Sequence, residues 1–220
     1  MEQSDEEREE SPRRRAIVVW AKRAAVALLF LFVVSFGGAV FALDHYEKGL
    51  PSTAELKTYS PPQVTRILAR DGTLLGEIFT ERRTVVPFAK IPDRMRLAAL
   101  AAEDAGFYEH TGLNYLGMLR AILVNLRSGG AKQGGSTITQ QVVKNMLLTP
   151  EKTMGRKIRE AILARRIEEE LTKNEILELY LNHIYFGHGR YGVEEAARFY
   201  FGKGVADVTL AEAATLAGLV

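Results

Sequence analysis

The chain has 220 residues, of which 47% are hydrophobic and 25% are charged. These are ordinary values for a globular protein, so they exclude wholesale disorder and collagen-like or low-complexity designs. Twenty-nine Lys and Arg against 27 Asp and Glu leave a net charge of +2, which is too small for a generic nucleic-acid binder that neutralises phosphates. The absence of cysteine excludes disulfide scaffolds, thiol catalysis and Cys-based zinc sites.

The first predicted element is an uncharged run of 20 residues, Ala24 to Leu43. A helix of this length covers about 30 Å, the thickness of the bilayer hydrocarbon, so residues 24–43 are expected to form a transmembrane helix. A cleaved signal peptide is the alternative, and we favour the uncleaved helix because signal peptides have a shorter apolar core. Arginine and lysine precede the run, whereas Asp44 follows it. The positive-inside rule therefore predicts a cytoplasmic tail over residues 1–23 and an extracytoplasmic chain after the helix.

Two short elements are predicted next. Residues 44–63 contain three prolines and are expected to form an extended linker. Residues 64–68 and 73–79 then flank Arg70-Asp71-Gly72, a sequence typical of a tight turn. This pattern predicts a small β-hairpin.

The pattern then becomes helical. The first helical segment opens at Pro92, and its apolar face is expected to consist of Met95, Leu97, Ala98 and Ala101. Later helices are predicted to begin where a threonine can accept hydrogen bonds from the N–H groups of a first turn. These starts are Thr149 followed by Pro150 and Glu151, and the capping pairs Thr172–Glu175 and Thr209–Glu212. The predicted fold class is therefore mainly α, with a small β element.

The first cluster with catalytic potential is Glu103-Asp104, which directly follows the apolar stretch 97–102. Carboxylates at the end of an apolar helix are partly desolvated, a setting that suits a general base. The alternative is an ordinary solvated helix terminus ended by Gly106. His110 is interpreted as a structural histidine, because no metal-binding spacing such as His-Glu-x-x-His surrounds it.

The second cluster is a glycine-rich loop over residues 129–135 and the polar helix start that follows it. The loop is not a P-loop, because no Gly-Lys-Ser/Thr follows at the required spacing. A flexible linker with an ordinary helix cap is the alternative interpretation. The helix start instead offers hydrogen-bonding groups suited to sugar hydroxyls and amides, namely Ser136, Thr137, Gln140, Gln141, Lys144 and Asn145.

The third cluster is Arg156-Lys157 with Glu160, which share one helix face by their spacing. Two cations beside a carboxylate can hold a pyrophosphate, while the acid orients a second group or a divalent ion. A salt-bridged solvent face is the commoner use of this pattern, and composition does not separate the two. Residues 165–170 are interpreted as a solvent face, and residues 173–182 as a packing helix without chemistry.

In this order, the clusters resemble the peptidoglycan glycosyltransferase domain of glycosyltransferase family 51, which occurs in class A penicillin-binding proteins and monofunctional transglycosylases. The resemblance covers roughly residues 67–220, most of the chain beyond the apolar run. The residues that carry it are Glu103-Asp104 with Phe107, His110 and Gly112; residues 135–141; Arg156-Lys157 with Glu160; Ile176-Leu177-Glu178 with Tyr180-Leu181-Asn182; and Gly189, Tyr191-Gly192, Glu195-Ala196-Ala197 and Tyr200-Phe201-Gly202-Lys203.

The resemblance implies a lysozyme-like glycosyltransferase domain over residues 64–220, with a membrane-embedded jaw, that polymerises lipid II. It implies that Glu103 deprotonates the 4-hydroxyl of the acceptor N-acetylglucosamine, which attacks the anomeric carbon of the donor N-acetylmuramic acid with inversion and expels undecaprenyl pyrophosphate. Glu160 is expected to position the donor or a divalent ion such as Mg²⁺, and no cofactor is otherwise required. The remaining substrate-binding residues are expected to be Asp104, Phe107, His110, Ser136, Thr137, Gln140, Gln141, Lys144, Asn145, Arg156 and Lys157.

The expected partners are lipid II, the growing glycan strand, membrane lipid and other cell-wall synthesis proteins, with no nucleic acid. The expected location is the bacterial inner membrane, crossed once, with the catalytic domain outside. Apolar side chains near the site are expected either to dip into the membrane interface or to pack in the core; they are Leu113, Tyr115, Leu116 and Met118.

Two other functions remain open at this stage. A lysozyme-like muramidase would need a protonated acid at Glu103 and would make little use of the basic cluster. A non-catalytic, membrane-anchored envelope scaffold would need neither acid. The chain holds no Ser-x-x-Lys motif of a transpeptidase, and its apolar end at residues 213–220 leads us to expect a glycosyltransferase domain shortened at its C-terminus.

Overall fold

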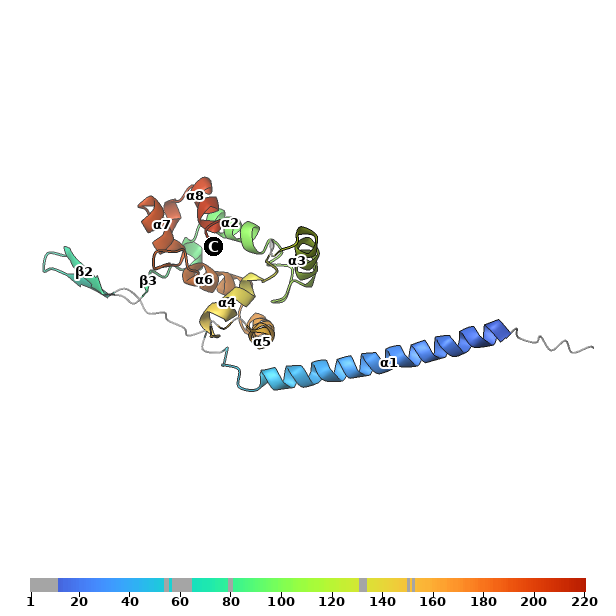
Figure 1. Cartoon of the computed structure of the whole chain (residues 1–220). Coiled ribbons are helices and arrows are strands. Elements are labelled where there is room, and N and C mark those ends of the chain that lie inside the picture. Colours follow the sequence, from blue (N-terminus) through green and yellow to red (C-terminus); the bar gives the residue numbers. More distant parts are fainter. Residues whose placement is uncertain are drawn as a thin grey trace, which may run out of the picture. The chain divides into compact units, whose positions relative to one another are not determined.

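The computed structural model (Figure 1) describes residues 12–53, 56, 65–78, 81–130, 134–149, 151 and 153–220. It consists of two compact units, Met1–Lys48 and Gly49–Val220. In the first unit the described residues form one long helix, α1 (Pro12–Glu47). Its segment Val19–Glu47 is the one described helix with the length and composition to cross a membrane. This segment contains the predicted apolar run 24–43.

The predicted β-hairpin is confirmed. Strands β1 (Thr65–Leu68) and β2 (Leu74–Ile78) pair antiparallel. The turn between them contains Gly72 at φ +84°, a conformation that glycine adopts without strain. The Oδ1 atom of Asp71 accepts a hydrogen bond from the backbone N–H of Thr73 at 3.0 Å, and this contact lowers the pKa of Asp71. Val64 and Phe79, the predicted ends of the hairpin, lie outside the described residues.

Helices form most of the remaining described part of the second unit (Figure 1). They are α2 (Asp93–Glu103), α3 (Tyr115–Ser128), α4 (Ile138–Met146), α5 (Met154–Glu170), α6 (Lys173–His183), α7 (Val193–Phe201) and α8 (Leu210–Ala217), with short 3-10 turns η2 (Phe88–Lys90) and η3 (Val205–Asp207). Helix α6 lies at the centre of the unit and buries Ile176, Leu177 and Leu181. Helix α4 packs against α5 and α6, and α2 packs against α8. The prediction of a mainly α fold is confirmed.

A short parallel pair of strands joins two parts of the second unit that are far apart in the sequence. Strand β3 (Arg82–Arg83) pairs with β4 (Arg190–Tyr191). Arg83 of β3 is buried, and its Nη1 donates a hydrogen bond to Nδ1 of His183 at 2.6 Å. Because a guanidinium can only donate, Nδ1 of His183 must accept and the ring is neutral. Burial, together with the charge of Arg83, lowers the pKa of His183 to about 3.

Two of the three predicted helix starts are confirmed, and one is wrong. Capping boxes begin α6 at Thr172 and α8 at Thr209. The start predicted at Thr149 is wrong, because α5 begins only at Met154, with Thr153 accepting a hydrogen bond from the N–H of Arg156 at 3.1 Å. Thr153 therefore takes the capping role that was predicted for Thr149, and the first buried residue of the helix is Glu160. Pro150 lies outside the described residues.

The predicted apolar face of α2 is also partly wrong. Met95, Ala99 and Leu100 are buried, whereas Leu97 is 63% exposed and Ala101 is exposed. Residues 95 and 99 are one helical turn apart, so they face α8 together, whereas Leu97 points about 160° away from that contact.

Part of the predicted linker 44–63 packs on the second unit. Leu56 belongs to the core cluster, and Leu50 packs against it. The hydroxyl of Thr53 donates to Oε1 of Glu170 at 2.5 Å, at the end of α5. The predicted extended conformation of residues 57–63 falls outside the described residues.

Candidate active site

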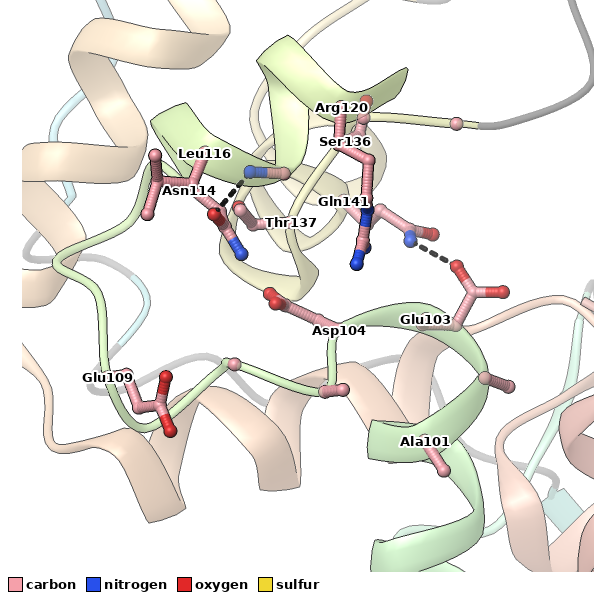
Figure 2. A pocket seen from close by; sticks show the side chains of 16 residues that line it. Ala101, Glu103, Asp104, Glu109, Asn114, Leu116, Arg120, Ser136, Thr137 and Gln141 are labelled. Carbon is pink, nitrogen blue, oxygen red and sulfur yellow. Dashed lines mark hydrogen bonds between the residues drawn. The ribbon is translucent and has the colours of Figure 1, made fainter. Parts of the chain in front are cut away.

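The two adjacent carboxylates at the end of α2 have different environments. Glu103 is the last residue of the helix and is half-buried, and Asp104 is the C-cap and is buried. The side-chain Nε2 of Gln141 donates a hydrogen bond to Oε2 of Glu103 at 2.7 Å (Figure 2). Glu103 is therefore held by one amide while it faces a cavity.

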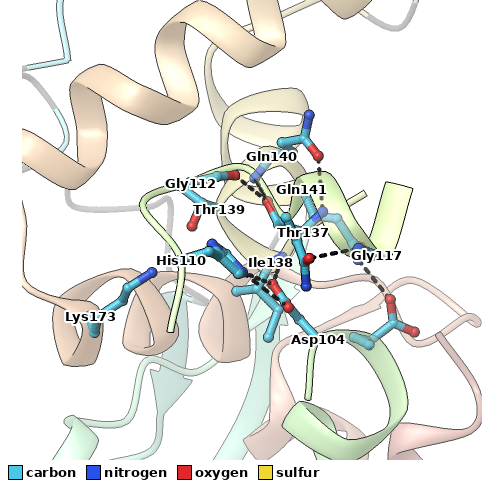
Figure 3. Close-up of polar contacts among 12 residues, drawn as sticks. Asp104, His110, Gly112, Gly117, Thr137, Ile138, Thr139, Gln140, Gln141 and Lys173 are labelled. Atoms are coloured by element: carbon cyan, nitrogen blue, oxygen red, sulfur yellow. Dashed lines mark hydrogen bonds and ion pairs between the residues drawn. The ribbon is translucent and has the colours of Figure 1, made fainter. Parts of the chain in front are cut away.

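Asp104 is engaged in the protein's own structure. Its Oδ2 accepts a hydrogen bond from the backbone N–H of Ile138 at 3.1 Å and lies 3.0 Å from Nε2 of His110 (Figure 3). The N–H of Ile138 belongs to the first turn of α4, where a negative charge is favourable. Because a carboxylate accepts, Nε2 of His110 carries the proton in this contact. Asp104 thus fixes the end of α2 to the start of α4.

The start of α4 is a capping box, in agreement with the helix cap given as the alternative interpretation of this segment. The hydroxyl of Thr137 accepts from the N–H of Gln140 at 3.2 Å and donates to the carbonyl of Gly112 at 2.6 Å. Oε1 of Gln140 in turn accepts from the N–H of Thr137 at 3.0 Å. Both side chains are buried, so they set the helix start, and this arrangement leaves Gln141 free to reach Glu103.

Gly112 brings the loop after α2 against α5. Its φ of +84° is in the left-handed region, and a Cβ there would lie 2.8 Å from the carbonyl oxygen of Ala164. Only glycine allows this approach. The loop that carries His110 therefore lies against α5 at Gly112 and is bonded to the start of α4 by Thr137.

A cavity of about 790 Å³ lies beside Glu103 (Figure 2). This volume is within the range of cavities that take small-molecule ligands. Five predicted site residues line it: Glu103, Asp104, Ser136, Thr137 and Gln141. Three polar lining residues were not predicted, namely Glu109, Asn114 and Arg120. The structure therefore brings together side chains from α2, the following loop, α3 and the start of α4.

The basic cluster lies next to this cavity. Nη1 of Arg156 donates to Oε2 of Glu160 at 2.7 Å, and Nζ of Lys157 donates to Oε1 of the same carboxylate. Glu160 is only 1% exposed, so the solvent-face alternative is wrong for this residue. Nζ of Lys157 also donates to Oγ of Ser136, a lining residue of the cavity, at 2.8 Å.

Seven predicted binding residues do not line the cavity, namely Phe107, His110, Gln140, Lys144, Asn145, Arg156 and Lys157. Phe107 and Gln140 are fully buried. Phe107 lies in the core with Nζ of Lys173 4.3 Å from its ring centroid, and packs edge-on against His110. Lys144 and Asn145 are exposed on α4. Phe107 and His110 therefore shape the site through the loop they support.

A buried polar contact beneath the site was missed. Oε1 of Glu168 accepts from the hydroxyl of Thr139 at 2.6 Å and from Nζ of Lys173 at 2.8 Å. It links α4, α5 and α6, so residue 168 is not part of the solvent face predicted for residues 165–170. Glu168 has no local pattern that distinguishes it from Glu169 and Glu170, because only the tertiary packing selects it.

Helix α3 beside the cavity has an exposed apolar face. Its start is capped by Asn114, whose Oδ1 accepts from the N–H of Gly117 at 2.7 Å. Leu116 lines the cavity and is 81% exposed. Leu113 and Met118 are half-buried. The other exposed apolar residues of the helix are Tyr115, Leu119, Ile122, Leu123, Val124 and Leu126.

Comparison with known proteins adds the following findings. Residues 71–220 match the family model described as transglycosylase. The chain is 46% identical to penicillin-binding protein 1A of Rickettsia conorii over 87% of this chain and 25% of that protein. The identity is 44% with penicillin-binding protein 1A of Aquifex aeolicus, over 90% of this chain and 27% of the relative. It is 49% with penicillin-binding protein 1A of Escherichia coli, over 83% and 22%. The chain thus spans about a quarter of the length of these relatives.

Proposed function

Because the chain belongs to the transglycosylase family, we propose that residues 64–220 polymerise lipid II into peptidoglycan glycan strands. The match confirms the family and the enzyme class predicted for this domain, and with them the lysozyme-like fold. The observation that carries the proposal is the position of Glu103 on the wall of a cavity of about 790 Å³ whose Ser136 is bonded to Lys157.

In the proposed reaction Glu103 is the general base. It takes the proton of the 4-hydroxyl of the acceptor N-acetylglucosamine while that oxygen attacks the anomeric carbon of the donor N-acetylmuramic acid. The new glycosidic C–O bond forms with inversion as the bond to undecaprenyl pyrophosphate breaks. Glu103 is better suited than Asp104, because the oxygens of Asp104 are occupied by His110 and the N–H of Ile138. Gln141 fixes the orientation of the base with a single hydrogen bond.

The leaving pyrophosphate needs charge neutralisation more than a proton, and we assign this role to Arg156 and Lys157. Glu160 holds both cations with its two oxygens and so fixes their spacing. The Arg156 side chain is 17% exposed, so part of its guanidinium remains accessible to an anion. Lys144, exposed on α4, would extend this cradle.

The surroundings of Glu160 do not suit a resident divalent ion. Both carboxylate oxygens are engaged by cations. No group of three His, Asp or Glu side chains in the described part of the chain is placed to hold a metal. The proposed mechanism therefore assigns no step to a metal ion.

We also propose that the domain works at a membrane surface. The exposed apolar face of α3 supports insertion into the membrane interface. The length and composition of α1 support a single-pass anchor in the inner membrane, with the N-terminus in the cytoplasm. Because lipid II stays in the membrane, an anchored enzyme meets it at high effective concentration. The growing glycan strand and other cell-wall synthesis proteins are the further proposed partners.

The test is an assay of the full-length chain in lipid vesicles with labelled lipid II. Formation of a polymer that lysozyme digests supports the proposal. Shortening of added glycan without polymer formation would instead identify a muramidase, and no turnover of either substrate would identify a scaffold.

A further inference from the structure

Tyr180 on α6 is buried next to the site. The residue is 2% exposed, and its hydroxyl bonds to none of the described residues. Buried tyrosine hydroxyls are nearly always hydrogen-bonded, because leaving one unpaired is costly. Packing in the core explains why the tyrosine ring is buried. It does not explain why a hydroxyl is buried with it.

A second, small cavity gives the hydroxyl a neighbour. Its volume is about 10 Å³, and its walls are otherwise apolar, formed by residues such as Met95, Ala99 and Leu181. Its two polar lining side chains are Tyr180 and Glu103. This volume is close to the minimum that holds one water molecule, which needs at least two polar partners.

Glu103 therefore lines two spaces. One is the large cavity, where Gln141 donates to its Oε2. The other is the small cavity that it shares with Tyr180. Burial, together with the negative charge of Glu103, raises the pKa of Tyr180. The hydroxyl is thus protonated at any working pH, and it can donate.

We propose that Tyr180 is a positioning residue for Glu103, donating a hydrogen bond to its carboxylate through one water molecule in the small cavity. Gln141 and Tyr180 then hold the carboxylate from the two spaces that it lines. The inference rests on the proposed role of Glu103 as the base. A donor to a carboxylate favours its charged form, which is the form a base requires.

The variant Tyr180→Phe tests the proposal, because it removes only the hydroxyl. In the full-length protein in detergent, with glutamate labelled with ¹³C at the side-chain carboxyl, the Glu103 signal is assigned by its loss in Glu103→Gln. The chemical shift of this signal at neutral pH is expected to change in Tyr180→Phe, because the carboxylate loses one of its two hydrogen-bond donors. Thermal unfolding should stay within a few degrees of the wild type. An unchanged chemical shift would overturn the proposal.

Tyr200→Phe is the matched control. Its hydroxyl donates to the carbonyl of Phe186 at 2.7 Å and does not line either cavity. This variant loses a hydrogen bond but should leave the chemical shift of the Glu103 signal unchanged. An equal shift in both variants would reveal a general effect of structure and would contradict the proposal.

Polymerisation kinetics separate this inference from the proposed function. With labelled lipid II, Tyr180→Phe should lower kcat and leave KM nearly unchanged, because the residue acts on the base and not on substrate binding. If the wild type fails to polymerise, the proposed function fails, while the NMR comparison still decides whether Tyr180 acts on Glu103.

Discussion

The Nζ atom of Lys157 lies 2.8 Å from the Oγ atom of Ser136 and joins the basic cluster on α5 to the wall of the cavity beside Glu103. Without this contact, the predicted base and the predicted cations would belong to separate parts of the surface. With it, a ligand that reaches Ser136 is within reach of a cation that is itself fixed by Glu160. The contact also shows how α5 contributes to a cavity that it does not line.

Replacing Lys157 should therefore impair turnover more than folding. In Lys157→Gln, Glu160 keeps Arg156 as a partner, so the fold should persist. Loss of a cation beside the leaving group is expected to lower kcat/KM for lipid II by about 10²- to 10³-fold. Lys203→Gln is the control, because Lys203 pairs with Glu212 and does not line the cavity. Equal rates in the two variants would contradict the assignment of Lys157 to the cradle.

Substitution of the adjacent acids should affect different properties, namely activity at Glu103 and stability at Asp104. Glu103→Gln should abolish polymerisation of labelled lipid II and leave the unfolding temperature nearly unchanged. Asp104→Asn should reduce stability by about 1 to 3 kcal/mol, because the carboxylate pairs with His110 and the N–H of Ile138 in a buried setting. A Glu103→Gln enzyme with near-normal rate would remove Glu103 as the base.

Gly112→Ala should be strongly destabilising. The added Cβ would meet the carbonyl oxygen of Ala164 at 2.8 Å in a backbone with φ +84°. We expect a loss of roughly 3 kcal/mol, from the left-handed conformation and the clash together. Gly129→Ala is the matched control, since its φ is +67° but the space around it is open, and it should cost about 1 kcal/mol.

These losses are measured by thermal unfolding with far-UV circular dichroism. Fluorescence would not serve, because the one tryptophan, Trp20, lies in α1 rather than in the second unit. Equal losses of stability in the two variants would show that the contact of residue 112 with Ala164 in α5 does not add to the cost of the substitution.

His183 should make the second unit less stable in mild acid. Its folded pKa of about 3 is below the ordinary value of 6.5, so between these values the unfolded chain binds a proton that the folded protein does not. The contribution of His183 to the free energy of unfolding is therefore constant above pH 6.5. It decreases as the pH falls from 6.5 toward 3. The loss is expected to be about 2 kcal/mol at pH 5.

Unfolding measured from pH 7 to pH 5 tests this, with His183→Gln as the comparison. The glutamine can accept from Arg83 but does not titrate, so the variant should show a smaller loss across the interval. Parallel pH dependence in the two proteins would assign the effect to other groups.

Local signals were sufficient to predict several elements. The Asp71-Gly72 turn and the capping pairs at Thr172 and Thr209 involve residues within four positions of each other, and the structure contains them as predicted. The same kind of signal failed at Thr149, because a second threonine four residues later, Thr153, caps α5 instead. Capping residues indicate where a helix can begin, but they do not decide between two nearby candidate starts.

The features that were not predicted depend on contacts between elements that are far apart in the sequence. Nothing near Leu97 shows that α8 covers the opposite face of α2. Arg120 reaches the cavity only because α3 lies beside the start of α4. The candidate site was easier to predict than these contacts, because its polar residues cluster in three short segments of the sequence. The fold then brings Glu103, Gln141 and Ser136 to one cavity.

The buried positions of Thr53 and Leu56 set where the folded unit physically begins. The family match starts at residue 71, but the compact unit starts at Gly49. A protein trimmed to residue 71 would lose the side chain that fills the core at position 56 and would leave Glu170 without the Thr53 hydroxyl. For preparing the catalytic unit without its apolar helix, the cut that preserves its packing lies at residue 49, 22 residues before the family match begins.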